Sequence, residues 1–206
     1  MKELTAERKQ IIRKNLLLSI CFFAAYTLVY LIFGVALGFN TPAGTPFTFF
    51  AFFETAGTLL LVMVFLHRFD PMYYNGIVFF ACFAQFGGAM LNFYNAIPIY
   101  DLLLHGASGI LLIFMAHYLL GLLLRHHPEV KLPSTVTLAF CWLFATASAA
   151  VWEIFEFTAD QLFGLDCQLG SLTDTMTDII AGTIGAVAGV LLLWLLLRKK
   201  QQAKET

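Results

Sequence analysis

The sequence has few charged residues, and basic residues are absent from most of its length. Charged residues make up 12% of the 206 residues, hydrophobic residues make up 60%, and the mean hydropathy is +0.80. All 12 Lys and Arg lie in four short segments: residues 2–14, Arg68, residues 125–131 and residues 198–204. This composition excludes a soluble globular protein and is typical of a polytopic helical membrane protein.

Closely spaced cysteines and an extended basic surface are also missing. The four cysteines (Cys21, Cys82, Cys141 and Cys167) form no pair with the spacing of a metal knuckle or a redox dithiol. The basic residues only flank apolar segments, so we expect no nucleic-acid binding. The first apolar run, residues 16–39, is longer than the apolar region of a signal peptide, and we expect it to remain as a membrane span.

Six apolar windows have roughly the 20 residues needed to cross a bilayer. They lie at about residues 16–38, 47–66, 76–93, 101–124, 136–157 and 176–197. The breaks between them contain proline or glycine. The sequence therefore predicts an all-α fold, a compact bundle of six transmembrane helices that forms a single integral membrane domain over residues 1–206. Small residues on the third and sixth spans would allow close helix packing.

The basic clusters predict how these spans are oriented. Every Lys and Arg lies at a terminus, in the loop after the second span or in the loop after the fourth span. By the positive-inside rule these regions face the cytoplasm, so both termini are expected there. Loops 39–46, 94–100 and 158–175 contain no basic residue and are expected to face outward.

The acidic residues follow a different distribution. Eight of the 13 acids lie in stretches without a Lys or Arg: Glu54, Asp101, Glu153, Glu156, Asp160, Asp166, Asp174 and Asp178. Unpaired carboxylates in or near a membrane are costly, so a cation or protons should accompany them. In the predicted orientation they gather at the outward ends of the second, fourth, fifth and sixth spans.

Several of these acids share a helical stripe with a second polar residue. The pairs are Asp101 with His105, Glu153 with Glu156, and Asp174 with Asp178. Asp160 continues the stripe of Glu156, and Glu54 lies about two turns into the second span. Helix capping offers Asp101 and Asp174 a structural role instead, because negative charge is favourable in a first helical turn.

Coulomb repulsion prevents so many close carboxylates from being ionised together, which leaves shared protons, a bound divalent cation or a passing monovalent cation. Asp101, His105, Asp174 and Asp178 are the candidate ligands for a divalent metal ion such as zinc, manganese, iron or magnesium. The candidate catalytic carboxylates are Glu153 and Glu156, and Glu54 and Asp160 are further candidates for the site.

These motifs resemble a known family. The pattern is Tyr100-Asp101-x-x-x-His105-x-x-x-Gly109, then Trp152-Glu153-x-x-Glu156, then Asp174-Thr175-x-x-Asp178 with Gly182 and Gly185. Over about residues 60–195 the chain resembles the YjdF-like family of small bacterial inner-membrane proteins, and it is more distantly similar to VanZ-like proteins. The resemblance implies a multi-pass protein of the bacterial inner membrane but brings no established activity.

Three functions remain open from the sequence. The first is a metal-dependent enzyme that acts at the outer leaflet on a lipid, a lipid-linked or another small-molecule substrate, with one carboxylate as general base. The second is a proton- or cation-coupled transporter, although no internal repeat is evident and the cytoplasmic half lacks acids. The third is a structural or accessory membrane protein whose polar groups join its helices. Membrane lipids are partners in each case, and the oligomeric state is open.

Overall fold

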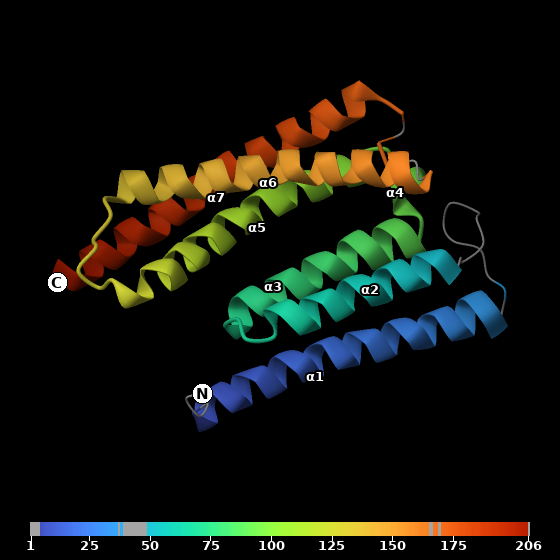
Figure 1. Cartoon of the computed structure of the whole chain (residues 1–206), viewed down its shortest axis with the longest axis horizontal. Coiled ribbons are helices and arrows are strands. Elements are labelled where there is room, and N and C mark those ends of the chain that lie inside the picture. The colour runs from blue at the N-terminus through green and yellow to red at the C-terminus, as the bar shows by residue number, and fades with distance from the viewer. Residues whose placement is uncertain (1–4, 37, 39–48, 165–166, 169, 206) are drawn as a thin grey trace. The chain divides into compact units, whose positions relative to one another are not determined.

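The computed structural model describes residues 5–36, 38, 49–164, 167–168 and 170–205, and all elements in these ranges are helical (Figure 1). The elements are α1 (Ala6–Val29), η1 (Tyr30–Ala36), α2 (Phe49–Leu66), α3 (Pro71–Ala81), η2 (Cys82–Met90), α4 (Phe93–Ala96), α5 (Tyr100–Leu123), η3 (Leu124–His126), α6 (Ser134–Phe163) and α7 (Leu172–Glu205). The predicted all-α class is confirmed. The chain divides into two compact units, Met1–Tyr100 and Asp101–Thr206, called the first and second unit below.

Within the described chain, 4 helical stretches are long and apolar enough to cross a membrane: Ala6–Ala36, Tyr100–His126, Ser134–Leu162 and Leu172–Lys199. They match the predicted first, fourth, fifth and sixth spans and extend beyond most of the predicted limits. Helix α2 falls in the predicted second span, where Ala56–Leu66 is a shorter apolar helix. Helix α3 and the π-helix η2 cover most of the predicted third span. The count of six spans and the orientation of the termini remain predictions.

The helix ends lie where the local sequence favours them. Thr5 caps α1 by accepting a hydrogen bond from the Arg8 amide at 3.3 Å, and Pro71 opens α3, where its missing N–H costs nothing. At the other ends, Asn92 follows η2 with φ 60° and Gly164 follows α6 with φ 66°. Both occupy the left-handed region, which Gly and Asn tolerate best.

The first unit packs its helices around two small apolar clusters. Leu59 and Val62 of α2 lie against Tyr74 and Val78 of α3. Neutral hydrogen bonds supplement this packing. Asn15 of α1 donates its amide to the carbonyl oxygens of His67 and Phe69 at 3.0 and 2.9 Å, and the hydroxyls of Ser19 and Tyr74 lie 2.6 Å apart.

The end of η2 shows why small residues occur there. A Cβ built on Gly87 would collide with the Tyr100 hydroxyl, and one built on Gly88 would collide with the Tyr94 ring. The same Tyr100 hydroxyl donates to the carbonyl oxygen of Phe83 at 2.7 Å. Aromatic side chains, rather than the backbone of another helix, approach Gly87 and Gly88, so the close helix packing predicted from these glycines does not occur at this point.

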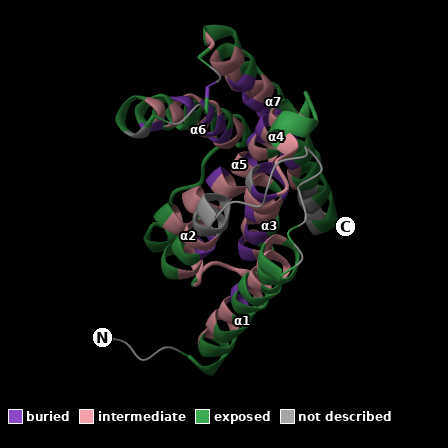
Figure 2. Cartoon of the chain, turned by 90° about the vertical axis from the view of Figure 1, so that its right-hand side faces the viewer, coloured by how far each residue is buried: buried purple, intermediate pink, exposed green. Residues whose placement is uncertain are grey.

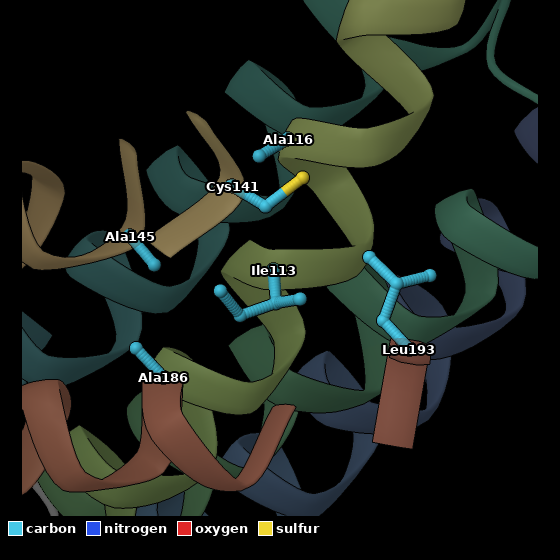
Figure 3. Packing of buried hydrophobic residues seen from close by; sticks show 6 residues of the cluster. All are labelled: Ile113, Ala116, Cys141, Ala145, Ala186 and Leu193. Atoms are coloured by element: carbon cyan, nitrogen blue, oxygen red, sulfur yellow. The ribbon is translucent and has the colours of Figure 1, made fainter. Parts of the chain in front are cut away.

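The core of the second unit contains small and branched side chains from α5, α6 and α7 (Figure 3). Its fully buried members are Ile113, Ala116, Cys141, Ala145, Ala186 and Leu193. Large apolar side chains of these helices are exposed, among them Val151, Ile154 and Ile184. Figure 2 shows in green how much of α6 and α7 is exposed. Such an apolar exterior is expected of helices that lipid surrounds.

Helices α5 and α7 approach each other along a line of glycines, Gly106 and Gly109 facing Gly182, Gly185 and Gly189, called here the glycine seam. A Cβ on Gly109 would collide with the carbonyl oxygen of Gly182 and would lie 2.8 Å from the Ala186 nitrogen. A Cβ on Gly185 would collide with the backbone of Gly106. The two backbones are therefore in direct contact, which confirms the close packing predicted for the small residues of the sixth span.

Candidate functional site

The predicted polar motifs of the second unit meet at the start of α5, the last part of α6 and the start of α7. Figure 1 shows these three helix ends at the same end of the second unit. The short connections between consecutive helices make α5 and α6, and α6 and α7, run in opposite directions. Residues separated by up to 77 positions in the sequence, such as Asp101 and Asp178, thereby share one level of the unit.

His105 lies at the centre of this site. Its Nε2 atom is 3.5 Å from Asp101 Oδ1, 3.8 Å from Glu153 Oε1 and 4.0 Å from Asp178 Oδ2. One ring nitrogen thus faces a carboxylate from each of the three helices. We call Asp101, His105, Glu153, Glu156 and Asp178 the carboxylate–histidine cluster.

The centre of the cluster is buried. His105 is 7% exposed, and Glu153 and Asp178 are each 3% exposed. The Asp101 side chain, at 35%, is more accessible and lies at the rim. Burying an ionised carboxylate costs far more than burying a neutral group unless a cation or a proton compensates for it.

One buried oxygen in the cluster has no hydrogen-bond partner. Glu153 Oε2 accepts a hydrogen bond from Gln168 Nε2 at 3.3 Å, whereas Glu153 Oε1 is buried and accepts none. Because Oε1 is the oxygen nearest His105 Nε2, the unpaired acceptor points into the cluster. Buried polar atoms in folded proteins nearly always have a partner, so this oxygen is an acceptor that is available to a ligand or a proton.

Glu156 occupies the side of the cluster nearest Trp152. The Trp152 indole N–H donates to Glu156 Oε1 at 2.8 Å, which fixes the carboxylate beside Glu153 and His105. Ligand atoms of His105, Glu153 and Glu156 lie within 4.8 Å of one another, as do those of Asp101, His105 and Asp178. Both triads use His105, so an ion bound to this imidazole would find carboxylate ligands in either triad.

Within each triad the ligand atoms lie somewhat farther apart than the ligands of a transition metal. Zinc ligands lie about 2.0–2.2 Å from the ion, which puts neighbouring ligand atoms of a tetrahedral site roughly 3.4 Å apart. The distances from His105 Nε2, at 3.5 to 4.0 Å, exceed that value by about 0.1 to 0.6 Å. A donor set of one imidazole and several carboxylates can bind zinc, manganese or iron.

Asp174 lies outside both triads but within their electrostatic range. The backbone N–H of Asp174 donates to Ser171 Oγ at 3.4 Å, in agreement with the predicted cap of the last helix. Its charge acts on Asp101, Glu153 and Asp178. Asp174 therefore adds negative potential to the site from the first turn of α7 and would strengthen cation binding without direct ligation.

The other two candidates have different surroundings. Both oxygens of Asp160 accept backbone hydrogen bonds from the loop between α6 and α7, from Cys167 at 2.8 Å and from Gln168 at 3.0 Å. Asp160 thus organises the loop instead of facing His105. Glu54 belongs to α2 in the first unit, and its side chain lies outside the described residues, as does Asp166.

The glycine seam closes the inner side of the cluster. Gly109 of α5 follows His105 by one turn, and Gly182 of α7 follows Asp178 by one turn. A Cβ on Gly182 would lie 3.0 Å from the Ala149 Cβ of α6 and 3.7 Å from the His105 carbonyl oxygen. All three helices touch here, so tightly packed backbone separates the cluster from the far end of the second unit.

Comparison with known proteins identifies the family of this chain but assigns no activity to it. Residues 18–199 match the family described as "Predicted membrane protein (DUF2238)". The chain belongs to this family. The match includes every member of the carboxylate–histidine cluster, and it supports a membrane location for this DUF2238 protein.

One curated relative, an uncharacterised protein of Thermotoga maritima, is 35% identical over 99 residues. The aligned part covers 48% of this chain and 49% of the relative, so it spans about half the length of each protein. No solved structure matches the chain. Neither the YjdF-like name nor the similarity to VanZ-like proteins comes from these comparisons.

Two residues of the site in this DUF2238 protein were not candidates from the sequence. Trp152 stood in the quoted motif next to Glu153, but only the structure shows its indole bound to Glu156. Gln168 is a single polar residue in a loop, and no pattern in the sequence singles it out. Its side chain is 9% exposed and reaches both the carbonyl oxygen and the carboxylate of Glu153.

Proposed function

We propose that the carboxylate–histidine cluster binds a divalent metal ion, with His105, Asp101, Asp178 and Glu153 as its ligands. The observation that carries this proposal is the buried, unpaired Oε1 atom of Glu153, 3.8 Å from His105 Nε2. The unprotonated nitrogen of a neutral imidazole and a carboxylate oxygen are both acceptors, so a cation between them would satisfy both. A proton on His105 would satisfy only part of the negative charge that four or more carboxylates bring together.

The donor set favours zinc or manganese. Imidazole is a good ligand for zinc and other transition metals, whereas magnesium prefers an octahedral shell of oxygen ligands and water. His105 lies at the intersection of both triads, so its nitrogen would be bound whichever carboxylates complete the shell. Magnesium is accordingly the weakest candidate among the predicted ions.

We further propose that the site is hydrolytic. A bound divalent ion would polarise a phosphoryl or carbonyl oxygen and would lower the pKa of a bound water. Glu156 would be the general base, because Trp152 holds it next to the cluster and it is more exposed than Glu153. Asp101, at the rim, would be the ligand nearest an entering substrate.

An open apolar groove along one side of α6, which includes Trp152, supports a lipid or lipid-linked substrate. It has a volume of about 430 Å³ and is lined by Phe144, Ala147, Ser148, Val151, Trp152 and Phe155 of α6. These residues cover roughly 16 Å of helix. Trp152 lines the groove and also hydrogen bonds to Glu156, so an acyl chain in the groove would bring its head group to the cluster.

The membrane orientation is part of the same proposal. We expect the chain to lie in a bacterial inner membrane with both termini in the cytoplasm and the cluster at the outer face. The basic residues Arg125, Arg198 and Lys199 support this orientation, because they lie at the opposite ends of α5 and α7 from the cluster.

A transporter receives less support from the second unit. Alternating access needs an open path on both sides of a site, and the glycine seam packs backbone against backbone directly below His105. A structural role also explains less, because joining the helices does not require a buried carboxylate oxygen without a partner. Cation flux in proteoliposomes that the Glu153→Gln substitution abolishes would favour transport instead.

The decisive experiment is elemental analysis of the full chain, purified in detergent without chelators, together with titration of the chelated protein with Zn²⁺, Mn²⁺ and Mg²⁺. We expect about one equivalent of Zn²⁺ or Mn²⁺ in the wild type. We expect the His105→Ala variant to lose at least a hundredfold in affinity, because both triads lose their common ligand.

Two matched variants control for general effects of substitution. His117→Ala removes another histidine from the same helix, and Glu129→Gln neutralises an exposed loop carboxylate. Both should keep the wild-type metal content. The proposal is wrong if the wild type binds none of these ions, or if His105→Ala retains the affinity of the His117→Ala variant.

A further inference from the structure

The loop between α6 and α7 contains a chain of hydrogen bonds that ends at the cluster. We propose that Asp160 and Gln168 are positioning residues that orient Glu153, so that its Oε1 atom is directed toward His105 and the cation. This inference deepens the proposed metal site and rests on it. It assigns a role to two residues that do not themselves face His105.

The first hydrogen bonds of this series join α6 to the loop that follows it. Asp160 Oδ1 accepts the N–H of Cys167 at 2.8 Å, and Asp160 Oδ2 accepts the N–H of Gln168 at 3.0 Å. Gly164, with φ 66°, turns the chain back between these residues. One ionised side chain thus binds two successive backbone N–H groups, and hydrogen bonds to a charged acceptor are about twice as strong as neutral ones.

The second link joins the loop to Glu153. Gln168 Nε2 lies 3.2 Å from the Glu153 carbonyl oxygen and 3.3 Å from Glu153 Oε2. The amide therefore spans the backbone and the side chain of the same residue, which defines the rotation of the carboxylate. The side chain of Gln168 is buried, so water does not compete for these bonds.

The two carboxylate oxygens of Glu153 therefore have different surroundings. Oε2 is occupied by Gln168, whereas Oε1 remains free of hydrogen bonds and faces His105. A carboxylate that is held by one oxygen presents the other in a fixed direction, as outer-shell groups do for metal ligands. Without Gln168, Glu153 could turn Oε1 away from the crowded carboxylates.

The test compares metal affinity in the full chain for Gln168→Leu, which removes the donor at similar size, for Asp160→Asn, and for the double variant. Loss of an outer-shell partner typically lowers metal affinity about 10- to 100-fold. We expect about a tenfold loss for Gln168→Leu and a smaller loss for Asp160→Asn. Because Asp160 acts through Gln168, the double variant should equal Gln168→Leu alone.

A second measurement does not depend on metal binding. Infrared difference spectra between the wild type and Glu153→Gln, both without metal, isolate the carboxyl band of Glu153. That band should shift in Gln168→Leu, because the carboxylate loses its hydrogen bond at Oε2. It should remain in place in Glu129→Gln, whose exposed carboxylate lies in another loop.

The outcomes separate this inference from the proposed function. If the wild type binds zinc or manganese and Gln168→Leu binds it equally well, the positioning role is wrong and the metal site stands. If the wild type binds no ion, the metal site is wrong and the infrared band decides the positioning role alone. Additive losses in the double variant would show that Asp160 does not act through Gln168 and would overturn that link.

Discussion

The two units bury different kinds of polar groups. In the first unit the buried polar side chains among the described residues are Asn15 and Ser19, which are neutral. In the second unit they are His105, Glu153, Gln168 and Asp178, and three of these four can carry a charge. Both units are apolar helical bundles of similar length, so membrane burial alone does not explain the difference.

The difference lies in what each polar group binds. Asn15 donates to two backbone carbonyls where α2 ends, and Ser19 pairs with Tyr74, so these groups hold the helices of the first unit together. The ionisable groups of the second unit face one another across distances of 3.5 to 4.0 Å instead. The first arrangement stabilises the protein by itself, whereas the second brings several acidic groups together, and under the proposed function a bound cation offsets their repulsion.

The largest loss of stability is expected from a substitution that adds a methyl group between the backbones of α5 and α7. In Gly109→Ala the new methyl group would collide with the backbone of Gly182, so we expect a loss of about 3 kcal/mol in unfolding free energy and loss of metal binding. Gly121→Ala on the same helix, and Gly57→Ala in the first unit, point into open space and should be neutral or stabilising by up to about 1 kcal/mol. Unfolding in mixed detergent measures all three.

Asn15 tests whether the polar groups of the first unit are purely structural. Asn15→Ala leaves the carbonyls of His67 and Phe69 without their donor, so we expect a loss of about 1–3 kcal/mol in stability. Metal affinity should remain that of the wild type. Asn95→Ala, at an exposed position, should change stability by less than about 0.5 kcal/mol. A change in metal affinity for Asn15→Ala would contradict the distinction between the units.

Substitution of Asp178 should stabilise the metal-free protein, whereas substitution of Asn15 should destabilise it. Asp178→Asn removes one of several buried like charges, so the metal-free protein should gain about 1 kcal/mol in stability while metal affinity falls at least tenfold. Ser19→Ala in the first unit should lose about 1 kcal/mol without any effect on metal. Thermal unfolding with and without a chelator separates the two quantities. Destabilisation of the metal-free protein by Asp178→Asn would mean that the carboxylate is structural.

Labelling of Cys167 tests which side of the membrane the cluster faces. Cys167 is exposed in the loop between α6 and α7, whereas the exposed Cys21 lies within the first candidate span. A membrane-impermeant maleimide added to whole cells should modify Cys167 and leave Cys21 unmodified, since the thiolate reacts and forms in water. The Cys167→Ser variant is the control. Modification of Cys167 only after the cells are opened would reverse the orientation.

The sequence predicted much of the site because helical spacing is a local property. Asp101 with His105, and Glu153 with Glu156, were placed on shared stripes by their positions alone, and the structure brings both pairs into one cluster. The expected place of Asp174 in the first turn of the last helix also followed from the sequence, and the Ser171 hydroxyl accepts its backbone N–H there. Asp160 shared the stripe of Glu156, yet its oxygens bind the amides of the following loop, because a loop conformation is not encoded in helical periodicity.

By itself, the sequence determined that this is an apolar all-helical chain whose basic and acidic residues are segregated, because composition and helical period fix which residues can face lipid and which must share a helix face. The tertiary structure alone decided which oxygen of Glu153 is free, that Gln168 and Trp152 hold the two glutamates, and that a seam of glycines closes the inner side of the cluster. These features depend on contacts between helices and loops that are distant in the chain. Their distances are set by backbone packing, which no local pattern specifies.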